Sequence, residues 1–143
     1  MQLDSLNANQ PSYDLIKLPP DITVLSSDNL AEMFTVLTGW ADYAATQFAA
    51  AQIKEKEAEK KVDRKVASLT VEKMGAATKA DKVTLIKAQI ALDPELQDLE
   101  DAYHQCYVNR KAWEVMLSNQ ERDITLVSRE ISRRDSEMKR RSI

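Results

Sequence analysis

The sequence predicts an all-α protein in which two long antiparallel helices are joined by a short helix and preceded by an extended N-terminal arm. The first observation is composition. The 143 residues include only 2 Gly and 4 Pro, with 43% hydrophobic and 30% charged residues, which is typical of long helices rather than strands and turns. The second observation is periodicity, because apolar residues recur at alternating spacings of three and four along two long stretches.

The N-terminal residues 1–27 contain Asn, Pro and Ser but no helical periodicity. We therefore expect an extended arm, followed by a helical hairpin domain over residues 28–143. The apolar run Leu15-Ile16-Lys17-Leu18 either docks on a neighbouring subunit or belongs to a loosely ordered tail.

The first long helix is predicted over residues 29–74. Asn29 is suited to cap its first turn, and Glu32 completes a capping box. The helix is expected to end before Gly75-Ala76-Ala77. Its predicted seam comprises Leu30, Phe34, Leu37, Ala41, Ala44, Phe48, Ala51, Ala58, Val62 and Leu69, interrupted by Glu55 and Lys65.

A short helix follows, with Val83, Ile86 and Ile90 on one face, and the second long helix is predicted over residues 94–139. Asp93 is suited to cap this helix, and Pro94 fits its first position, where no amide hydrogen is needed. Its predicted seam comprises Leu96, Leu99, Tyr103, Cys106, Arg110, Trp113, Leu117, Gln120, Ile124, Val127, Ile131, Arg134 and Met138.

A hairpin of two long helices cannot enclose a core, because each helix has only one neighbour. We therefore expect a homo-oligomer, in the form of a ring or a bundle. The aromatic residues are interpreted first as packing residues of the core or of a subunit interface. They are Trp40, Tyr43, Tyr103, Tyr107 and Trp113.

No pattern of catalytic residues is found, so we expect a protein that is not an enzyme and has no cofactor. The single histidine, His104, and the single cysteine, Cys106, are too sparse for a metal site or an activated nucleophile. No phosphate-binding glycine loop occurs. The chain lacks a signal-peptide pattern and a run of about 20 apolar residues, which favours a soluble cytoplasmic protein without a membrane partner.

The formal net charge of −3 hides alternating acidic and basic segments. Residues 1–53 carry six acids and one Lys, and residues 88–109 carry five acids and no base. Residues 54–87, which lie between these two segments, carry ten basic and six acidic groups, and residues 110–143, which follow them, carry nine basic and six acidic groups. Basic surface for a polyanion is therefore available despite the acidic pI of about 5.3.

Two basic clusters are candidate nucleic-acid-binding surfaces. In the first helix Lys60, Lys61, Arg64 and Lys65 lie beside the seam, although interleaved acids also allow a solvated helix with pairs such as Glu57 to Lys61. In the second, arginines at steps of 7, 4 and 7 lie opposite the seam, and arginine binds phosphate through its planar fork. These are Arg122, Arg129, Arg133 and Arg140; from this segment Arg129, Arg133 and the adjacent Arg134 are taken as binding residues.

The order of these features over residues 28–134 resembles the UvsY-type recombination mediators of bacteriophages. The features are Trp40, the run Glu57-Ala58-Glu59-Lys60-Lys61-Val62-Asp63-Arg64-Lys65-Val66, the linker around Gly75, Asp93-Pro94-Glu95, Cys106, Trp113, and the ending Val127-Ser128-Arg129-Glu130-Ile131-Ser132-Arg133-Arg134. The resemblance implies that Lys60, Lys61, Arg64 and Lys65 contact DNA. In place of the family's basic-aromatic continuation, this chain has Ala67-Ser68-Leu69-Thr70.

The resemblance implies a small helical homo-oligomer that binds single-stranded DNA and helps to load a strand-exchange recombinase onto DNA coated by single-strand binding protein. If the chain is encoded by a phage, its place of action is the cytoplasm of the host cell. The alternative is a helical structural or adaptor protein of a phage, acting in assembly or protein-protein interaction without binding DNA.

Overall fold

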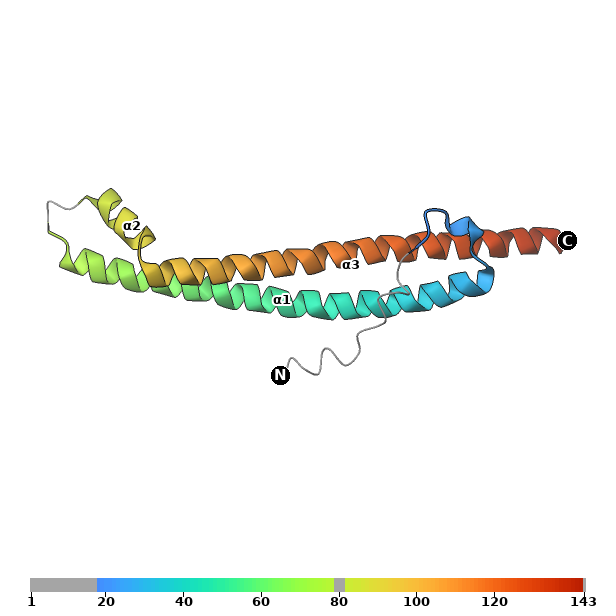
Figure 1. Cartoon of the computed structure of the whole chain (residues 1–143), viewed down its shortest axis with the longest axis horizontal. Coiled ribbons are helices and arrows are strands. Elements are labelled where there is room, and N and C mark those ends of the chain that lie inside the picture. Colours follow the sequence, from blue (N-terminus) through green and yellow to red (C-terminus); the bar gives the residue numbers. More distant parts are fainter. Residues whose placement is uncertain (1–17, 79–81, 143) are drawn as a thin grey trace. The chain divides into compact units, whose positions relative to one another are not determined.

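A computed structural model of the chain describes residues 18–78 and 82–142. Its elements are the short 3-10 helix η3 (Ile22–Val24) and the α-helices α1 (Ser27–Ala76), α2 (Val83–Ala91) and α3 (Pro94–Arg141) (Figure 1). The described residues contain no strand. The predicted all-α class, with two long helices joined by a short one, is confirmed.

The chain divides into two compact units. Unit 1 consists of residues 1–48 and 112–143, and unit 2 consists of residues 49–111. Within unit 1 the beginning of α1 packs against the end of α3. Within unit 2 the rest of α1 packs against α2 and the beginning of α3. Unit 1 is therefore made of two chain segments that are distant in sequence, whereas unit 2 is one continuous segment.

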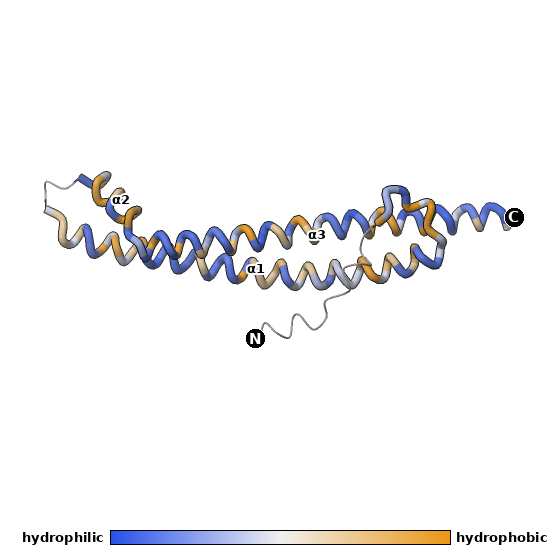
Figure 2. Tube along the Cα trace, viewed as in Figure 1, coloured by the Kyte–Doolittle hydropathy of each residue, from blue (hydrophilic) through white to orange (hydrophobic). Residues whose placement is uncertain are grey.

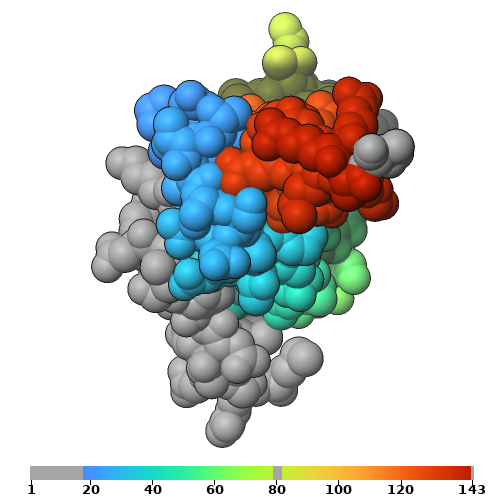
Figure 3. Space-filling view, turned by 90° about the vertical axis from the view of Figure 1, so that its right-hand side faces the viewer, coloured from blue at the N-terminus to red at the C-terminus, as the bar shows by residue number. Residues whose placement is uncertain are grey.

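The core of unit 1 is formed by Leu30, Leu37 and Val127, all fully buried. Half-buried residues pack around it, including Leu18 and Leu25. Those two lie in residues 18–26, which we call the N-terminal strap. Figure 3 shows described residues near the N-terminus, in blue, against the red end of α3. The described part of the predicted arm therefore contributes to the core, whereas residues 1–17 lie outside the described part of the chain.

An aromatic cluster extends this core along α1. Trp40 and Tyr43 are buried and meet edge to face at 5.6 Å, and Trp113 of α3 meets Tyr43 at 5.7 Å. Such pairs are worth about 0.5–1.5 kcal/mol beyond their buried area. The prediction that these three aromatics are packing residues is confirmed within this unit.

The seam of α1 agrees with the prediction over most of its length and differs near the start of the helix. Phe34 was placed in the seam but is 37% exposed, whereas Trp40, which neighbours the predicted Ala41, is 2% exposed. Met33 packs on the core next to Leu30 and Leu37. The contact face at the start of α1 thus runs through Met33 and Trp40 rather than through Phe34 and Ala41.

The start of α1 also differs from the prediction. The helix begins at Ser27 rather than Asn29, and the Ser26 hydroxyl accepts a hydrogen bond from the Asn29 amide at 3.1 Å. Asn29 is thus inside the first turn, and Ser26 is the capping residue.

The core of unit 2 gathers one buried residue of α1, two of α2 and one of α3. These are Leu69, Ile86, Ile90 and Leu96. The Asp93 carboxylate accepts a hydrogen bond from the Leu96 amide at 3.0 Å, and α3 begins at Pro94. Both predictions for the start of α3 are confirmed. The hydropathy colouring in Figure 2 shows hydrophobic positions along α2.

The seam of α3 agrees with the prediction almost throughout. Leu96, Gln120 and Val127 are buried, and the intervening seam residues are half-buried, but Met138 is 70% exposed. In unit 2 the seam contains a charge: Arg110 donates from Nε to Glu55 of α1 at 2.5 Å and from Nη2 at 3.3 Å. Its guanidinium also lies 5.0 Å from the centre of the Tyr107 ring. Glu55 and Lys65 interrupt the apolar seam of α1, and both side chains are half-buried.

Candidate nucleic-acid interface

The arginine row of α3 is exposed in unit 1. Arg122, Arg129, Arg133 and Arg140 all lie on the solvent side of the helix, opposite buried Val127. At about 1.5 Å of rise per residue, Arg129 and Arg133 are about 6 Å apart along the axis, and each outer arginine lies about 10 Å further on. The predicted outward position of this row is confirmed.

The four arginines differ in whether their guanidinium groups already pair with an acidic side chain. Arg129 and Arg140 make no hydrogen bond or ion pair with another residue of the described chain, and Arg122 donates only to the neutral Asn119 side chain at 3.2 Å. Arg133 instead pairs with Glu130 at 2.7 Å and with Glu137 at 2.5 Å. We therefore expect Arg122, Arg129 and Arg140 to offer more positive potential to a phosphate than Arg133 does.

Glu130 is the anionic centre of this segment, with a side chain only 7% exposed. Hydrogen bonds from Arg133 lower the pKa of the Glu130 carboxyl to about 2. Burial of the carboxyl opposes this shift, and a hydrogen bond from Arg134 adds to it. The same pair raises the pKa of the Arg133 guanidinium above its usual value. The cluster therefore remains ionised over the physiological pH range.

The position of Arg134 corrects our expectation of a guanidinium available to DNA. Its side chain is 18% exposed and donates to Glu130 at 3.0 Å and to the Ser27 hydroxyl at 3.2 Å. It also donates to the backbone carbonyls of Thr23 at 3.2 Å and Leu25 at 2.7 Å. Arg134 thus fastens the N-terminal strap to α3, and its planar fork of donors is occupied within unit 1.

The basic run of α1 lies in unit 2, where Lys60, Lys61 and Arg64 are exposed and make no ion pair with the described residues. Lys65 differs, because its side chain is 25% exposed and pairs with Glu95 at 2.5 Å. Hydrogen bonding to Glu95 raises the pKa of the Lys65 ammonium. Three of the four lysine and arginine residues in this predicted site are thus available to a ligand, and Lys65 has a role in the fold.

The acids interleaved with this run are only partly engaged. Lys56 pairs with Glu59 at 3.1 Å, and hydrogen bonding to Glu59 raises the pKa of the Lys56 ammonium. The pair from Glu57 to Lys61 that the sequence suggested does not form in this structure. Exposed Glu57 and Asp63 nevertheless lie on the same helix, and they reduce the positive potential of this surface.

Sequence reasoning missed one exposed aromatic surface in unit 2. Tyr107 is 42% exposed, and its ring stacks on His104 at 6.3 Å with an interplanar angle of 20°. The signal was the spacing of three residues between His104 and Tyr107, which places both on one side of the helix. Tyr107 therefore does not contribute to a core in the way that Trp40 and Tyr43 do.

Three further observations concern metal ligands, the free thiol and membrane-spanning helices. Among residues 18–78 and 82–142, no three His, Cys, Asp or Glu side chains converge as they would around a metal ion. Cys106 is a half-buried free thiol. A search of the same residues finds no helix with the length and apolar character needed to span a bilayer.

Comparison with protein-family models, with curated proteins and with solved structures finds no match to this chain.

Proposed function

We propose that this protein is an accessory protein of phage recombination that binds single-stranded DNA and helps to load a strand-exchange recombinase. The observation that carries the proposal is the exposed row formed by Arg122, Arg129 and Arg140, whose guanidinium groups have no acidic partner in the described chain. A row of arginines without acidic partners can bind successive phosphates of a nucleic-acid backbone. Such a row is not needed to keep a helix soluble. The resemblance to UvsY-type mediators supplies the biological setting.

The proposal assigns one basic surface to each unit. The surface of unit 1 is the arginine row, with Arg133 in a secondary role. The surface of unit 2 is Lys60, Lys61 and Arg64. Lys65 and Arg134 are left out, because their charges are used by Glu95 and by the N-terminal strap.

Binding by this protein depends on many weak contacts. Each phosphate contact releases counterions, so affinity falls steeply as salt rises. In a homo-oligomeric ring or bundle, which we include in the proposal, the same modest surface is repeated by symmetry and affinity rises through avidity. The mediator holds the strand while the recombinase replaces single-strand binding protein in the host cytoplasm. No covalent step is involved, so no catalytic residue or cofactor is required.

The test is fluorescence anisotropy of a labelled oligo-dT with the full-length protein over a series of salt concentrations, with mass measured by light scattering in the same buffers. We expect salt-dependent binding by a defined oligomer. Arg129→Gln should weaken binding about 3- to 10-fold and reduce the salt slope by about one unit, since one phosphate contact is lost. The matched control is Lys87→Gln, which removes one charge from an exposed lysine of α2 outside both surfaces. Absence of binding at low salt by a folded oligomer would refute the proposal.

A second candidate is a helical adaptor that binds a protein partner and no DNA. The observation in its favour is the number of large apolar side chains that stay exposed in unit 2. They include Val71 at 75%, Leu92 at 72% and Leu85 at 51% exposure. Oligo-dT separates the two candidates, because an adaptor should show no salt-dependent binding.

A further inference from the structure

The three arginines of the row that lack an acidic partner share a second feature, a hydroxyl residue four positions before each of them. Ser or Thr stands there before Arg122, Arg129 and Arg140, whereas the position before Arg133 is held by another arginine. The spacing Ser/Thr-x-x-x-Arg therefore occurs three times in the row, at the arginines whose guanidinium groups do not pair with acids of the described chain. The three hydroxyl residues are Ser118, Thr125 and Ser136.

Helix geometry places each hydroxyl beside its arginine. Residues four positions apart lie on the same face of a helix, with Cβ atoms about 5–6 Å apart. All six side chains are exposed and belong to unit 1. At about 100° per residue, no acid between positions 118 and 140 lies within roughly 60° of Arg129 around the helix axis, and Glu137, further round, already pairs with Arg133. We call the three pairs the α3 outer face.

The hydroxyls of this face are not explained by the stability of the helix. Ser and Thr are weaker helix formers than Ala, Glu or Lys at exposed positions. Thr125 and Ser136 donate to the backbone carbonyl one turn earlier, at 2.9 and 3.0 Å. Such a carbonyl also accepts the amide bond of the helix. A hydroxyl can therefore rotate its hydrogen toward a ligand without leaving that carbonyl unpaired.

A hydroxyl beside a guanidinium matches the chemistry of a phosphodiester. The guanidinium neutralises the charge and donates to one oxygen, and the hydroxyl donates to the other. A carboxylate, by contrast, is satisfied by the two parallel donors of arginine alone. Residues 114–143 contain no Phe, Trp, Tyr or His, so this face carries no ring on which a base could stack. The pattern therefore favours the sugar-phosphate backbone over bases or acidic side chains.

The spacing of the pairs assigns one phosphate to each. At about 1.5 Å of rise per residue, the pair of Ser118 and Arg122 is centred about 10 Å from the pair of Thr125 and Arg129, and the third pair lies about 16 Å further on. These separations are too large for two pairs to share one phosphate. The three contacts are therefore independent of one another.

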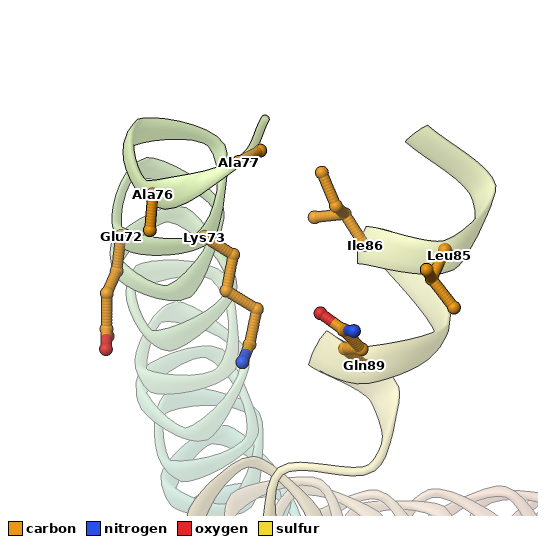
Figure 4. A pocket seen from close by; sticks show the side chains of 7 residues that line it. All are labelled: Glu72, Lys73, Ala76, Ala77, Leu85, Ile86 and Gln89. Atoms are coloured by element: carbon orange, nitrogen blue, oxygen red, sulfur yellow. The ribbon is translucent and has the colours of Figure 1, made fainter. Parts of the chain in front are cut away.

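The pocket in unit 2 shows no such selectivity. It has a volume of about 250 Å³ and lies between the end of α1 and α2, where Figure 4 shows Lys73 pointing from α1 and Ile86 and Gln89 pointing from α2. Its two charged lining residues, Glu72 and Lys73, are one base and one acid whose charges cancel. The pocket thus favours neither an anion nor a cation, whereas the α3 outer face favours an anion.

We propose that each Ser/Thr-x-x-x-Arg pair of the α3 outer face binds one phosphate of a sugar-phosphate backbone, through the hydroxyl and the guanidinium together. The inference rests on the proposed function and specifies its ligand at the unit 1 surface, which is a phosphodiester chain of any base sequence. The arginine supplies the salt-dependent part of each contact. The hydroxyl supplies a neutral part that salt does not screen.

The test is fluorescence anisotropy of labelled oligo-dT, and of an abasic strand of the same length, with the full-length protein over a series of salt concentrations. The variants are Ser118→Ala, Thr125→Val, Arg129→Gln and the double variant of the last two. Two matched controls remove a hydroxyl elsewhere in unit 1. Ser128→Ala lies about 100° around α3 from Arg129, and Thr46→Val removes an exposed hydroxyl of α1 that donates to the carbonyl one turn earlier at 3.0 Å.

We expect Ser118→Ala and Thr125→Val to weaken binding about 3- to 10-fold on both strands, without changing the salt slope, because each loses one neutral hydrogen bond. Both controls should stay within about twofold of the wild type. In the double variant, the loss should be smaller than the product of the two single losses, since Thr125 and Arg129 act on the same phosphate.

Three outcomes would overturn the inference. If the wild type binds oligo-dT and Arg129→Gln weakens binding, but Thr125→Val binds like Thr46→Val, the hydroxyls are not ligands and the proposed function stands. If poly-glutamate displaces the labelled strand as well as unlabelled oligo-dT does at equal charge concentration, the face selects anions in general and an acidic protein surface fits it equally. If the folded wild type binds no oligo-dT at low salt, the inference and the proposed function fail together.

Discussion

Replacing Arg134 by Met should destabilise unit 1 because it releases the N-terminal strap. The change retains an apolar stem but removes donation to two backbone carbonyls of the strap, at 3.2 and 2.7 Å, and to the Ser27 hydroxyl. Hydrogen bonds to a charged group are worth about 1.5–3 kcal/mol each. In the variant, the carbonyls of the strap can accept hydrogen bonds from water, which restores part of this free energy. We therefore expect the free energy of unfolding to fall by about 2–4 kcal/mol.

The matched control is Arg129→Met, the same change on the exposed face of the same helix. It should alter stability by less than about 0.5 kcal/mol while weakening DNA binding. The chain has 2 Trp residues, and both Trp40 and Trp113 belong to unit 1, so tryptophan fluorescence during urea unfolding reports on that unit. Hydrogen exchange of the amides of residues 21–26 should rise in Arg134→Met alone. Equal stability of the two variants, or unchanged exchange in the strap, would refute the structural role of Arg134.

Three further predictions follow from single contacts. Gln120→Leu should raise the free energy of unfolding by about 1–2 kcal/mol, since Gln120 is 5% exposed and its Oε1 has no hydrogen-bond partner in the described chain; a lower melting temperature would show that this oxygen is satisfied. Because the Glu130 pKa is depressed from 4.5 to about 2, the contribution of Glu130 to stability is complete above pH 4.5 and is lost as the pH falls toward 2. The stability of Glu130→Gln should therefore change less between pH 4.5 and pH 2 than that of the wild type. An unchanged acid-unfolding profile would contradict the assignment. Asp93→Ala should cost about 1 kcal/mol through loss of the cap on α3, measured by urea unfolding; no cost would mean that packing of Leu96 holds the helix start.

The seam of α3 was predictable except at Met138, whereas that of α1 was not predictable at the start of the helix. Along α3 polar residues separate the apolar ones, so only one face is possible, and even the buried position of Gln120 follows from its spacing. Along α1 the apolar arc is wider, since both Phe34 and Met33, and both Ala41 and Trp40, are apolar. Two alternations of three and four then fit equally well. The larger ring of Trp40 takes the buried place, and periodicity alone does not contain that preference.

The positions of the candidate interface residues on their helices were predictable, but which of their charges are free to bind a ligand was not. Helical spacing places Arg129 on the exposed face, and this holds in the structure. For Lys65 and Arg134, whether the charge is engaged depends on residues that are distant in the chain, whereas the partners of Arg133 are three and four positions away. Lys65 pairs with Glu95, 30 positions away, and Arg134 contacts Leu25, 109 positions away. No local pattern reports such contacts, so the sequence treats these two residues like their exposed neighbours.

The ion pair between Arg110 and Glu55 has a consequence for the alignment of the two long helices in unit 2. A heptad seam repeats, so sliding one helix by seven residues would keep most apolar contacts. Such a slip would place Glu55 opposite Tyr103 or Leu117, or Arg110 opposite Phe48 or Val62. A half-buried charge would then face apolar side chains without a partner, which costs several kcal/mol. The pair therefore works as a register key: it adds little to the strength of the correct alignment, but it makes the shifted alignments unfavourable.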